Sequence, residues 1–347
     1  MKSLWKKAAA GALLAAALFG AGCAPVVREG TPPAEAPDLS YDPAHYPVTV
    51  ETLDSRGEKR EETFERPPRR VAAIWQNSIE TLIALGVGDR IIAAMGLPDE
   101  KYLRPEYRET YRHIPYTSME NLDVETMLME EPDLIVGWMS SFGPKTLRST
   151  EFWRGRGVAS YISQGSDFTK PDRRHTVEDE YRDILNLGKI FDREEKAREI
   201  VGAMKEAVSR AEQRAARQGR RPRGLVIEYL NRDIHVYGEK TLAGDIVRKM
   251  GGELLGPELT SISKEQIIEM DPDAVFIAVI ESAYGSEEQI LDQFREEKAL
   301  RELRCVKEGR VYALPLYAVY SAGVRTYDGI QIIGKGLYPG MEEGGEA

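Results

Sequence analysis

Short apolar runs alternate with amphipathic segments over most of the chain. The runs are typical of buried strands, and the segments between them repeat apolar residues at the three- and four-residue spacing of helices. Continuous apolar strands that alternate with helices are typical of parallel sheets covered on both faces. The pattern therefore predicts an α/β fold. Strands are expected at 71–75, 91–95, 134–138, 158–163, 225–229, 234–237, 275–279 and 311–314, and helices at 78–85, 124–129 and 242–250.

One arrangement occurs twice, 140 residues apart. Glu125 and Glu265 each stand seven residues before a Pro-Asp pair, on a short helical pattern that leads through the Pro-Asp turn into a strand. Internal repetition of this kind predicts two lobes of similar design. Each lobe is expected to carry one glutamate at the same structural place.

A long helical pattern separates the two lobes. Between 192 and 218, apolar residues recur at three- and four-residue spacing opposite a face of Glu, Lys and Arg. A helix of this length measures roughly 40 Å. A coiled-coil arm is the competing interpretation, but a rigid strut better explains one helix between two lobes. The prediction is two Rossmann-like lobes with parallel sheets, at 46–191 and 219–342, joined by the helix over 192–218.

The N-terminus has the pattern of an export signal. Three lysines precede an apolar stretch over 8–22, which is too short for a bilayer span of ~20 residues, and Cys23 follows directly. A Cys at this point resembles the lipobox of bacterial lipoproteins, in which it carries the lipid, although Gly20 replaces the usual aliphatic residue. A plain signal peptide with an unmodified Cys23 is the alternative. We expect a signal peptide at 1–22 and a lipid anchor at Cys23.

Residues 23–45 are rich in Pro, Ala and Glu without apolar periodicity, and are expected to form a disordered tether. The formal charge of the whole chain is −10, and removal of a signal that contains three lysines makes it more negative. This charge argues against nucleic acid as a partner. With Cys23 lipidated, Cys305 is alone and no intrachain disulfide is expected.

Motifs of enzymes are missing from the sequence, which contains no G-x-S-x-G, P-loop or H-E-x-x-H pattern. Ser261 and Lys264 match the short S-x-x-K pattern of serine acylases, but they stand where a helix begins and fit a helix cap better. A secreted two-lobe hydrolase remains a distant alternative, and a sensory domain is weaker still. No cofactor is expected.

A metal site is not expected either. Zinc and manganese carriers usually present three or four clustered ligands, whereas the histidines of this chain are scattered. The first of them falls in the expected tether. The four are His45, His113, His175 and His235.

Aromatic residues stand where the expected strands end. In open parallel sheets, ligands bind beyond the carboxyl ends of the strands. Flat aromatic walls with a few Arg and Tyr donors suit a large, rigid, partly anionic metal complex, although core packing of any single residue is an equal alternative. The candidate ligand-binding residues are Trp75, Met95 and Trp138 in the first lobe and Tyr229, Tyr237, Tyr284 (or Glu281), Tyr317, Tyr320 and Arg325 in the second.

Several phrases together resemble one family. They are Pro68-Arg69-Arg70-Val71, the run 79–86, Asn121-Leu122, the two Glu-x6-Pro-Asp units, Gly251-Gly252 and the run 309–312. Their order and spacing over 46–339 are similar to the helix-linked substrate-binding proteins of ABC transporters, which carry iron–siderophore complexes, haem or cobalamin. The resemblance implies two lobes bridged by one helix, with the ligand held between them.

The resemblance also gives the repeated glutamates a role. In family members, one glutamate on each lobe docks onto arginines of a two-fold symmetric permease, and Glu125 and Glu265 match those positions. Glu120 and Asp123 lie close enough to compete with the first assignment, and solvated helix acids are the plain alternative. The expected protein is a monomeric, lipid-anchored lipoprotein on the outer side of the cell membrane. It would bring a ferric siderophore, or alternatively cobalamin or haem, to an ABC permease dimer.

Overall fold

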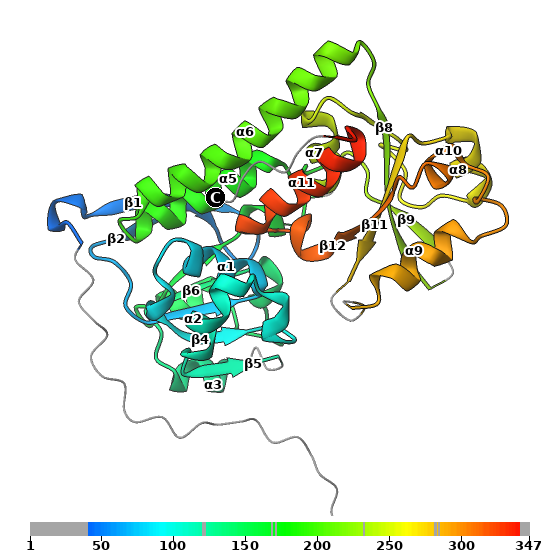
Figure 1. The fold of residues 1–347 in the computed structure, drawn as a ribbon. Helices are drawn as coiled ribbons and strands as arrows, with labels where there is room; N and C mark the ends of the chain where they lie inside the picture. The colour runs from blue at the N-terminus through cyan, green and yellow to red at the C-terminus, as the bar shows by residue number, and fades with distance from the viewer. Residues whose placement is uncertain are drawn as a thin grey trace, which may run out of the picture.

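The computed structural model describes residues 41–119, 123–167, 169–170, 172–231, 233–280, 283 and 285–340. Two α/β lobes lie side by side, and one long helix runs along both (Figure 1). The elements of the N-terminal lobe are β1 (Val48–Leu53), β2 (Lys59–Phe64), β3 (Val71–Ile74), α1 (Gln76–Ala84), β4 (Ile91–Met95), α2 (Arg108–Arg112), β5 (Tyr116–Ser118), α3 (Val124–Met129), β6 (Leu134–Gly137), α4 (Thr150–Arg154), β7 (Ala159–Ile162) and α5 (Val177–Ile190).

The C-terminal lobe repeats the alternation of strands and helices. Its elements are β8 (Arg223–Leu230), β9 (Asp233–Val236), α7 (Leu242–Lys249), β10 (Glu253–Leu254), α8 (Lys264–Met270), β11 (Ala274–Val279), α9 (Glu287–Arg295), α10 (Arg304–Lys307), β12 (Val311–Pro315), the 3-10 turns η8 (Leu316–Ala318) and η9 (Gly323–Arg325), and α11 (Thr326–Leu337).

Each lobe is built on a five-stranded sheet. The first has the order β5-β4-β3-β6-β7 with every pair parallel. The second has the order β10-β8-β11-β12, also parallel, and β9 pairs antiparallel with the end of β8. Every residue of β3, β6 and β11 is buried, as expected for strands that have helices on both faces. The predicted fold class is therefore confirmed.

The Pro-Asp repeat has the same structure in both lobes. Glu131 and Asp271, which precede the two prolines, both adopt positive φ angles, of 46° and 41°. Asp133 then accepts hydrogen bonds from two backbone amides before β3, and Asp273 accepts one at 2.8 Å from the Arg223 amide at the start of β8. Each aspartate thus fastens the start of its own strand to that of the neighbouring strand.

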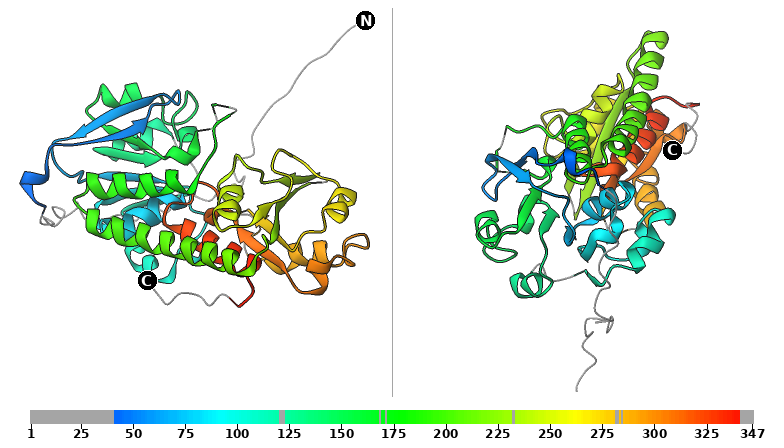
Figure 2. Two further views of the ribbon diagram at one scale, coloured as in Figure 1. Left: turned by 90° about the horizontal axis from the view of Figure 1, so that it is seen from above. Right: turned by 90° about the vertical axis from the view of Figure 1, so that its left-hand side faces the viewer.

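Helix α6 (Glu194–Gln218) is the predicted strut. Its 25 residues span about 37 Å, and α5 and α11 flank it (Figure 2). The face that packs inward is apolar and fully buried at Ala197, Met204 and Ala211. Gly219 ends the helix in the left-handed conformation, with φ 64°. The strut is not the only connection between the lobes, because η9 also reaches the N-terminal lobe.

Candidate functional site: an aromatic cleft between the lobes

Two tryptophans form the wall of the N-terminal lobe. Trp75 directly follows β3 and Trp138 directly follows β6, and these strands are neighbours in the sheet. Their rings stack, with centroids 5.0 Å apart and planes inclined by 24°. The structure thus brings together two residues that the sequence had placed at separate strand ends.

Trp75 is held in place from several sides. Its amide donates to the Met95 carbonyl at 2.8 Å, and its indole Nε1 donates to the Ser141 hydroxyl at 3.1 Å. The backbone at Trp75 has a φ of 72°, which is rare for a bulky residue and is often found at functional sites. Gly96 makes the ring position possible, since a Cβ there would lie 2.6 Å from the indole.

The C-terminal lobe closes the same cavity from the opposite side. Tyr320 meets Trp138 edge to face, with ring centroids 5.4 Å apart, and Tyr317 lies on the cavity wall beside it. The remaining volume is about 20 Å³, which is room for about one water molecule. The aromatic rings therefore fill the cleft themselves, and a ligand of several hundred Å³ requires them to separate.

Three polar atoms on this wall are buried without a hydrogen-bond partner in the described part of the chain. They are Trp138 Nε1, Asn77 Oδ1 and Ser321 Oγ, and all three residues line the cavity. Unpaired buried polar groups are uncommon and costly, so a cluster of them points to a ligand that satisfies them. Sequence reasoning missed Asn77 and Ser321. The only available signal was that each lies within two residues of an aromatic residue that it did select.

Three other candidates lie elsewhere. Met95 is buried in the core of the N-terminal lobe. Tyr237 is buried, and its hydroxyl donates to Glu228 at 2.7 Å. Tyr229 borders a separate hollow together with Lys264 and Gln293, where burial, followed by the Glu297 carboxylate, raises its pKa to about 12. Tyr284, Glu281 and Cys23 lie outside the described residues.

Arg325 has partners within the protein. Its guanidinium lies 2.8 Å from the Glu80 carboxylate in α1, pairs with Asp328, and covers the Tyr317 ring at 4.0 Å. Burial lowers the pKa of Arg325, but Glu80 and Asp328 raise it by more, so the side chain stays charged. Because Arg325 is 6% exposed and already paired with two carboxylates, we do not include it in the ligand wall.

Turn η9 carries Arg325 into the N-terminal lobe and forms a joint between the lobes. The Gly323 amide donates to Glu180 of α5 at 2.5 Å, and the Val324 amide donates to Thr81 of α1. Gly323 has a φ of 55°, and a Cβ there would lie 2.4 Å from the Thr81 hydroxyl, so only glycine fits. The joint thus holds η9 between α1 and α5.

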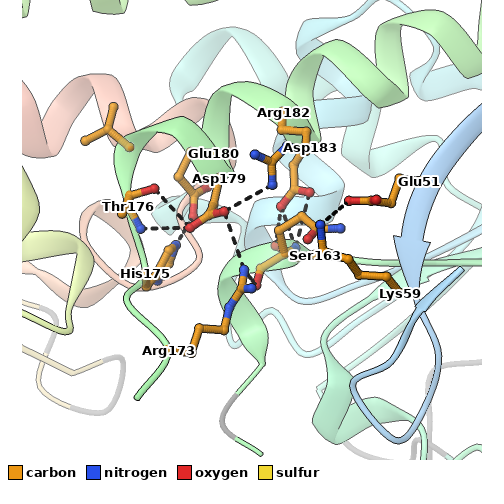
Figure 3. Close-up of polar contacts among 12 residues, drawn as sticks. Glu51, Lys59, Ser163, Arg173, His175, Thr176, Asp179, Glu180, Arg182 and Asp183 are labelled. Carbon is orange, nitrogen blue, oxygen red and sulfur yellow. Dashed lines mark hydrogen bonds and ion pairs between the residues drawn. The ribbon is translucent and has the colours of Figure 1, made fainter. Parts of the chain in front are cut away.

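Helix α5 also carries other acidic residues with polar partners next to Glu180, among them Asp179 and Asp183 (Figure 3). Glu180 pairs with His175 at 2.5 Å, and Asp183 accepts hydrogen bonds from the Tyr161 hydroxyl at 2.8 Å and the Ser163 hydroxyl at 2.7 Å. Burial, followed by repulsion from Glu180, raises the pKa of Asp183 to about 7.

The repeated glutamates are both exposed, at the starts of α3 and α8. Asp123 caps α3 and Ser263 caps α8, two residues before the glutamate in each case. Three residues after the glutamates, Leu128 is 41% exposed and Ile268 is 43% exposed. The two lobes therefore present the same acidic and aliphatic pair.

Most of the chain matches a known protein family. The sequence profile of the periplasmic binding protein family matches residues 71–318. The chain belongs to this family. Periplasmic binding proteins of this type are the ligand-binding components of ABC transporters for siderophores and vitamin B12, and they are not enzymes. The prediction of a binding protein without enzymatic activity is thereby confirmed.

Individual relatives agree with the family. A periplasmic binding protein of known structure from Veillonella parvula is 40% identical with a TM-score of 0.81, over 85% of this chain and 92% of that chain. The petrobactin-binding protein YclQ of Bacillus subtilis is 26% identical, over 85% of this chain and 89% of its own length. An uncharacterized ABC transporter substrate-binding lipoprotein of the same organism, YvrC, is 20% identical, over 94% and 96%.

No helix in the described part of the chain is both long and apolar enough to cross a bilayer.

Proposed function

We propose that this periplasmic binding protein captures a ferric siderophore between its lobes and delivers it to an ABC importer. The observation that carries the proposal is the cavity wall, which four aromatic residues line together with three residues that each have a buried polar atom without a partner among the described residues. Aromatic faces provide broad contact area, and the polar atoms supply the few directional bonds that orient a ligand. The petrobactin-binding relative favours a siderophore as cargo over cobalamin or haem.

The binding residues in this proposal are Trp75, Trp138, Tyr317 and Tyr320, with Asn77 and Ser321 as polar partners. Cargo entry would separate the Trp138 ring from Tyr320, because the two come from opposite lobes. The unpaired Trp138 Nε1 can donate to a catecholate or hydroxamate oxygen, and the Asn77 carbonyl can only accept.

Docking on the permease is assigned to Glu125 and Glu265 as part of the same proposal. A symmetric receptor needs two like charges at a fixed separation, and carboxylate–guanidinium pairs are geometrically specific. We add Leu128 and Ile268 to this surface, because exposed aliphatic residues at matching positions fit the apolar rim of an interface. The protein would act as a monomer, anchored to the outer side of the cell membrane through Cys23, as a lipoprotein relative suggests.

Tryptophan fluorescence provides the test. The purified chain is titrated with a ferric catecholate, a ferric hydroxamate, cyanocobalamin and haemin. Saturable quenching by one of the ferric siderophores, with a stoichiometry of one, is the expected result. Saturation by cobalamin or haemin alone would replace the siderophore with that cargo, and no saturation by any of the four would overturn the proposal.

A further inference from the structure

The segment before β1 is folded onto the start of the strut. A 3-10 turn over Pro43–His45 lies against the connection between α5 and α6, although the sequence had suggested a tether up to residue 45. The Asp42 amide donates to the Asp192 carboxylate at 2.8 Å, and the Tyr46 hydroxyl donates to the Ile190 carbonyl at 2.8 Å. These contacts bring His45 beside two acidic residues that lie about 150 positions away in the sequence.

The orientation of the His45 ring defines which nitrogen is free. Its Nε2 lies 2.8 Å from the Lys189 carbonyl oxygen. A carbonyl oxygen can only accept, so Nε2 carries the proton in this bond. In the neutral ring, Nδ1 is therefore a bare lone pair. It points at carboxylate oxygens of Asp192 and Glu194, at 3.8 and 3.5 Å.

The charges around this group are unbalanced. Neither carboxylate has a lysine or arginine nitrogen within 4.0 Å among the residues that the structure describes. Two carboxylates and an imidazole lone pair thus face one another, with all three ligand atoms within 4.8 Å. This arrangement places one nitrogen and two oxygen ligand atoms where a single cation can contact all of them.

We propose that His45, Asp192 and Glu194 bind a divalent transition metal ion of the Zn²⁺ type. Tetrahedral zinc with nitrogen and oxygen ligands at about 2.0–2.2 Å sets those ligands roughly 3.3–3.6 Å apart, which small side-chain rotations reach from the observed distances. The Lys189 carbonyl fixes the ring and its tautomer, as outer-shell partners of metal-bound histidines usually do. An imidazole ligand disfavours Ca²⁺ and Mg²⁺.

The bound ion would fasten residues 42–45 to the start of α6 and to the loop before it. All three side chains keep 15–30% of their surface exposed, so solvent can fill the remaining coordination positions. The site shares no residue with the aromatic cleft, and the proposal does not depend on the identity of the cargo.

Zinc titration of the untagged, chelator-treated chain tests the site. We expect one Zn²⁺ ion to bind in competition with a chromophoric chelator, and the affinity to fall by at least about tenfold in His45→Ala and in Glu194→Gln. His113→Ala is the matched control, because its Nδ1 lies 3.8 Å from the single carboxylate of Glu109 on an exposed helix.

Thermal unfolding gives a second readout of the same site. Saturating Zn²⁺ should raise the Tm of the wild type and of His113→Ala, but not that of His45→Ala, because an ion that binds only the folded state stabilises it. Failure of the wild type to bind Zn²⁺, or equal binding by His45→Ala, would overturn the proposal.

Discussion

The aromatic cleft and the joint at η9 both connect the two lobes, but they differ in how their polar groups are satisfied. The chain between η8 and α11 supplies Tyr317 and Tyr320 to the cleft and Arg325 to the joint. In the joint, the guanidinium and its carboxylates are paired. In the cleft, Trp138 Nε1 and Ser321 Oγ have no partner among the described residues. The paired groups of the joint stabilise the contact between the lobes. The unpaired polar atoms of the cleft can form their hydrogen bonds only with a bound ligand.

Removal of Arg325 should have the largest effect on the purified protein. Arg325→Met leaves Glu80 buried without its cation, and breaking a buried pair from one side typically costs about 3–5 kcal/mol in the free energy of unfolding. Urea unfolding measures this loss. Arg112→Met, which breaks an exposed pair with Glu100, should produce no measurable change. If Arg325→Met weakens cargo binding while the free energy of unfolding is unchanged, Arg325 belongs to the aromatic cleft. That result would contradict its assignment to the joint.

Asp183, three residues after Glu180 of the joint in α5, should also give the protein a distinctive pH dependence. The pKa of Asp183 is raised to about 7 in the folded state, so the folded protein binds more protons than the unfolded chain from about pH 4 to 7. Its contribution to stability is complete below the unfolded pKa and is lost as the pH rises through 7. The difference between wild type and Asp183→Asn should therefore change on the order of 3 kcal/mol across this range. A pH-independent difference in urea unfolding would contradict it.

Changes in the cleft should weaken cargo binding in a protein that still folds. Trp138→Ala removes a stacking face, which typically contributes ~0.5–1.5 kcal/mol beyond burial, or roughly threefold to tenfold in Kd for the cargo. Tyr229→Ala is the matched control, because Tyr229 also lies near the end of a strand but borders a different hollow. Isothermal titration with both folded variants decides the assignment. Equal losses, or a loss only in Tyr229→Ala, would move the ligand out of the aromatic cleft.

The repeated glutamates should have the smallest effect on the purified protein. Glu125→Lys with Glu265→Lys should leave unfolding and cargo affinity unchanged, because both side chains are exposed. Uptake should be lost, since each change would place like charges together at the permease. A growth assay on the cargo measures this, with Glu130→Lys, at the residue that follows α3, and Glu269→Lys, in α8, as the control. Normal uptake by the first variant would exclude the docking assignment.

Much of this architecture was predictable from local pattern. Apolar runs located the strands, and the duplicated Pro-Asp turns predicted two lobes. The positions of Trp75 and Trp138 directly after two neighbouring strands were predictable, because strand ends in a parallel sheet are local features. The burial of Met95 in the core was not predictable, since periodicity does not tell which way the last residue of a fully buried strand points. Tyr237 lies away from the aromatic cleft because β9 runs antiparallel at the edge of an otherwise parallel sheet.

Pairings between distant residues were not predictable. Glu80 and Arg325 are 245 residues apart, and nothing near either one marks it as the partner of the other. His45 appeared isolated for the same reason, because Asp192 and Glu194 reach it only through the fold. The sequence likewise cannot show which buried polar atoms lack a hydrogen-bond partner. Asn77 and Ser321 were therefore recognised as candidate ligand-binding residues only from the structure.

A crystal structure of the protein loaded with its ferric siderophore tests the central claim most directly. We expect the cargo to lie between the Trp75–Trp138 stack and the tyrosines of the second lobe, with Trp138 Nε1 donating to it and the Arg325–Glu80 pair intact. A cargo bound in the hollow beside Tyr229, with the Trp138–Tyr320 contact unchanged, would contradict the account.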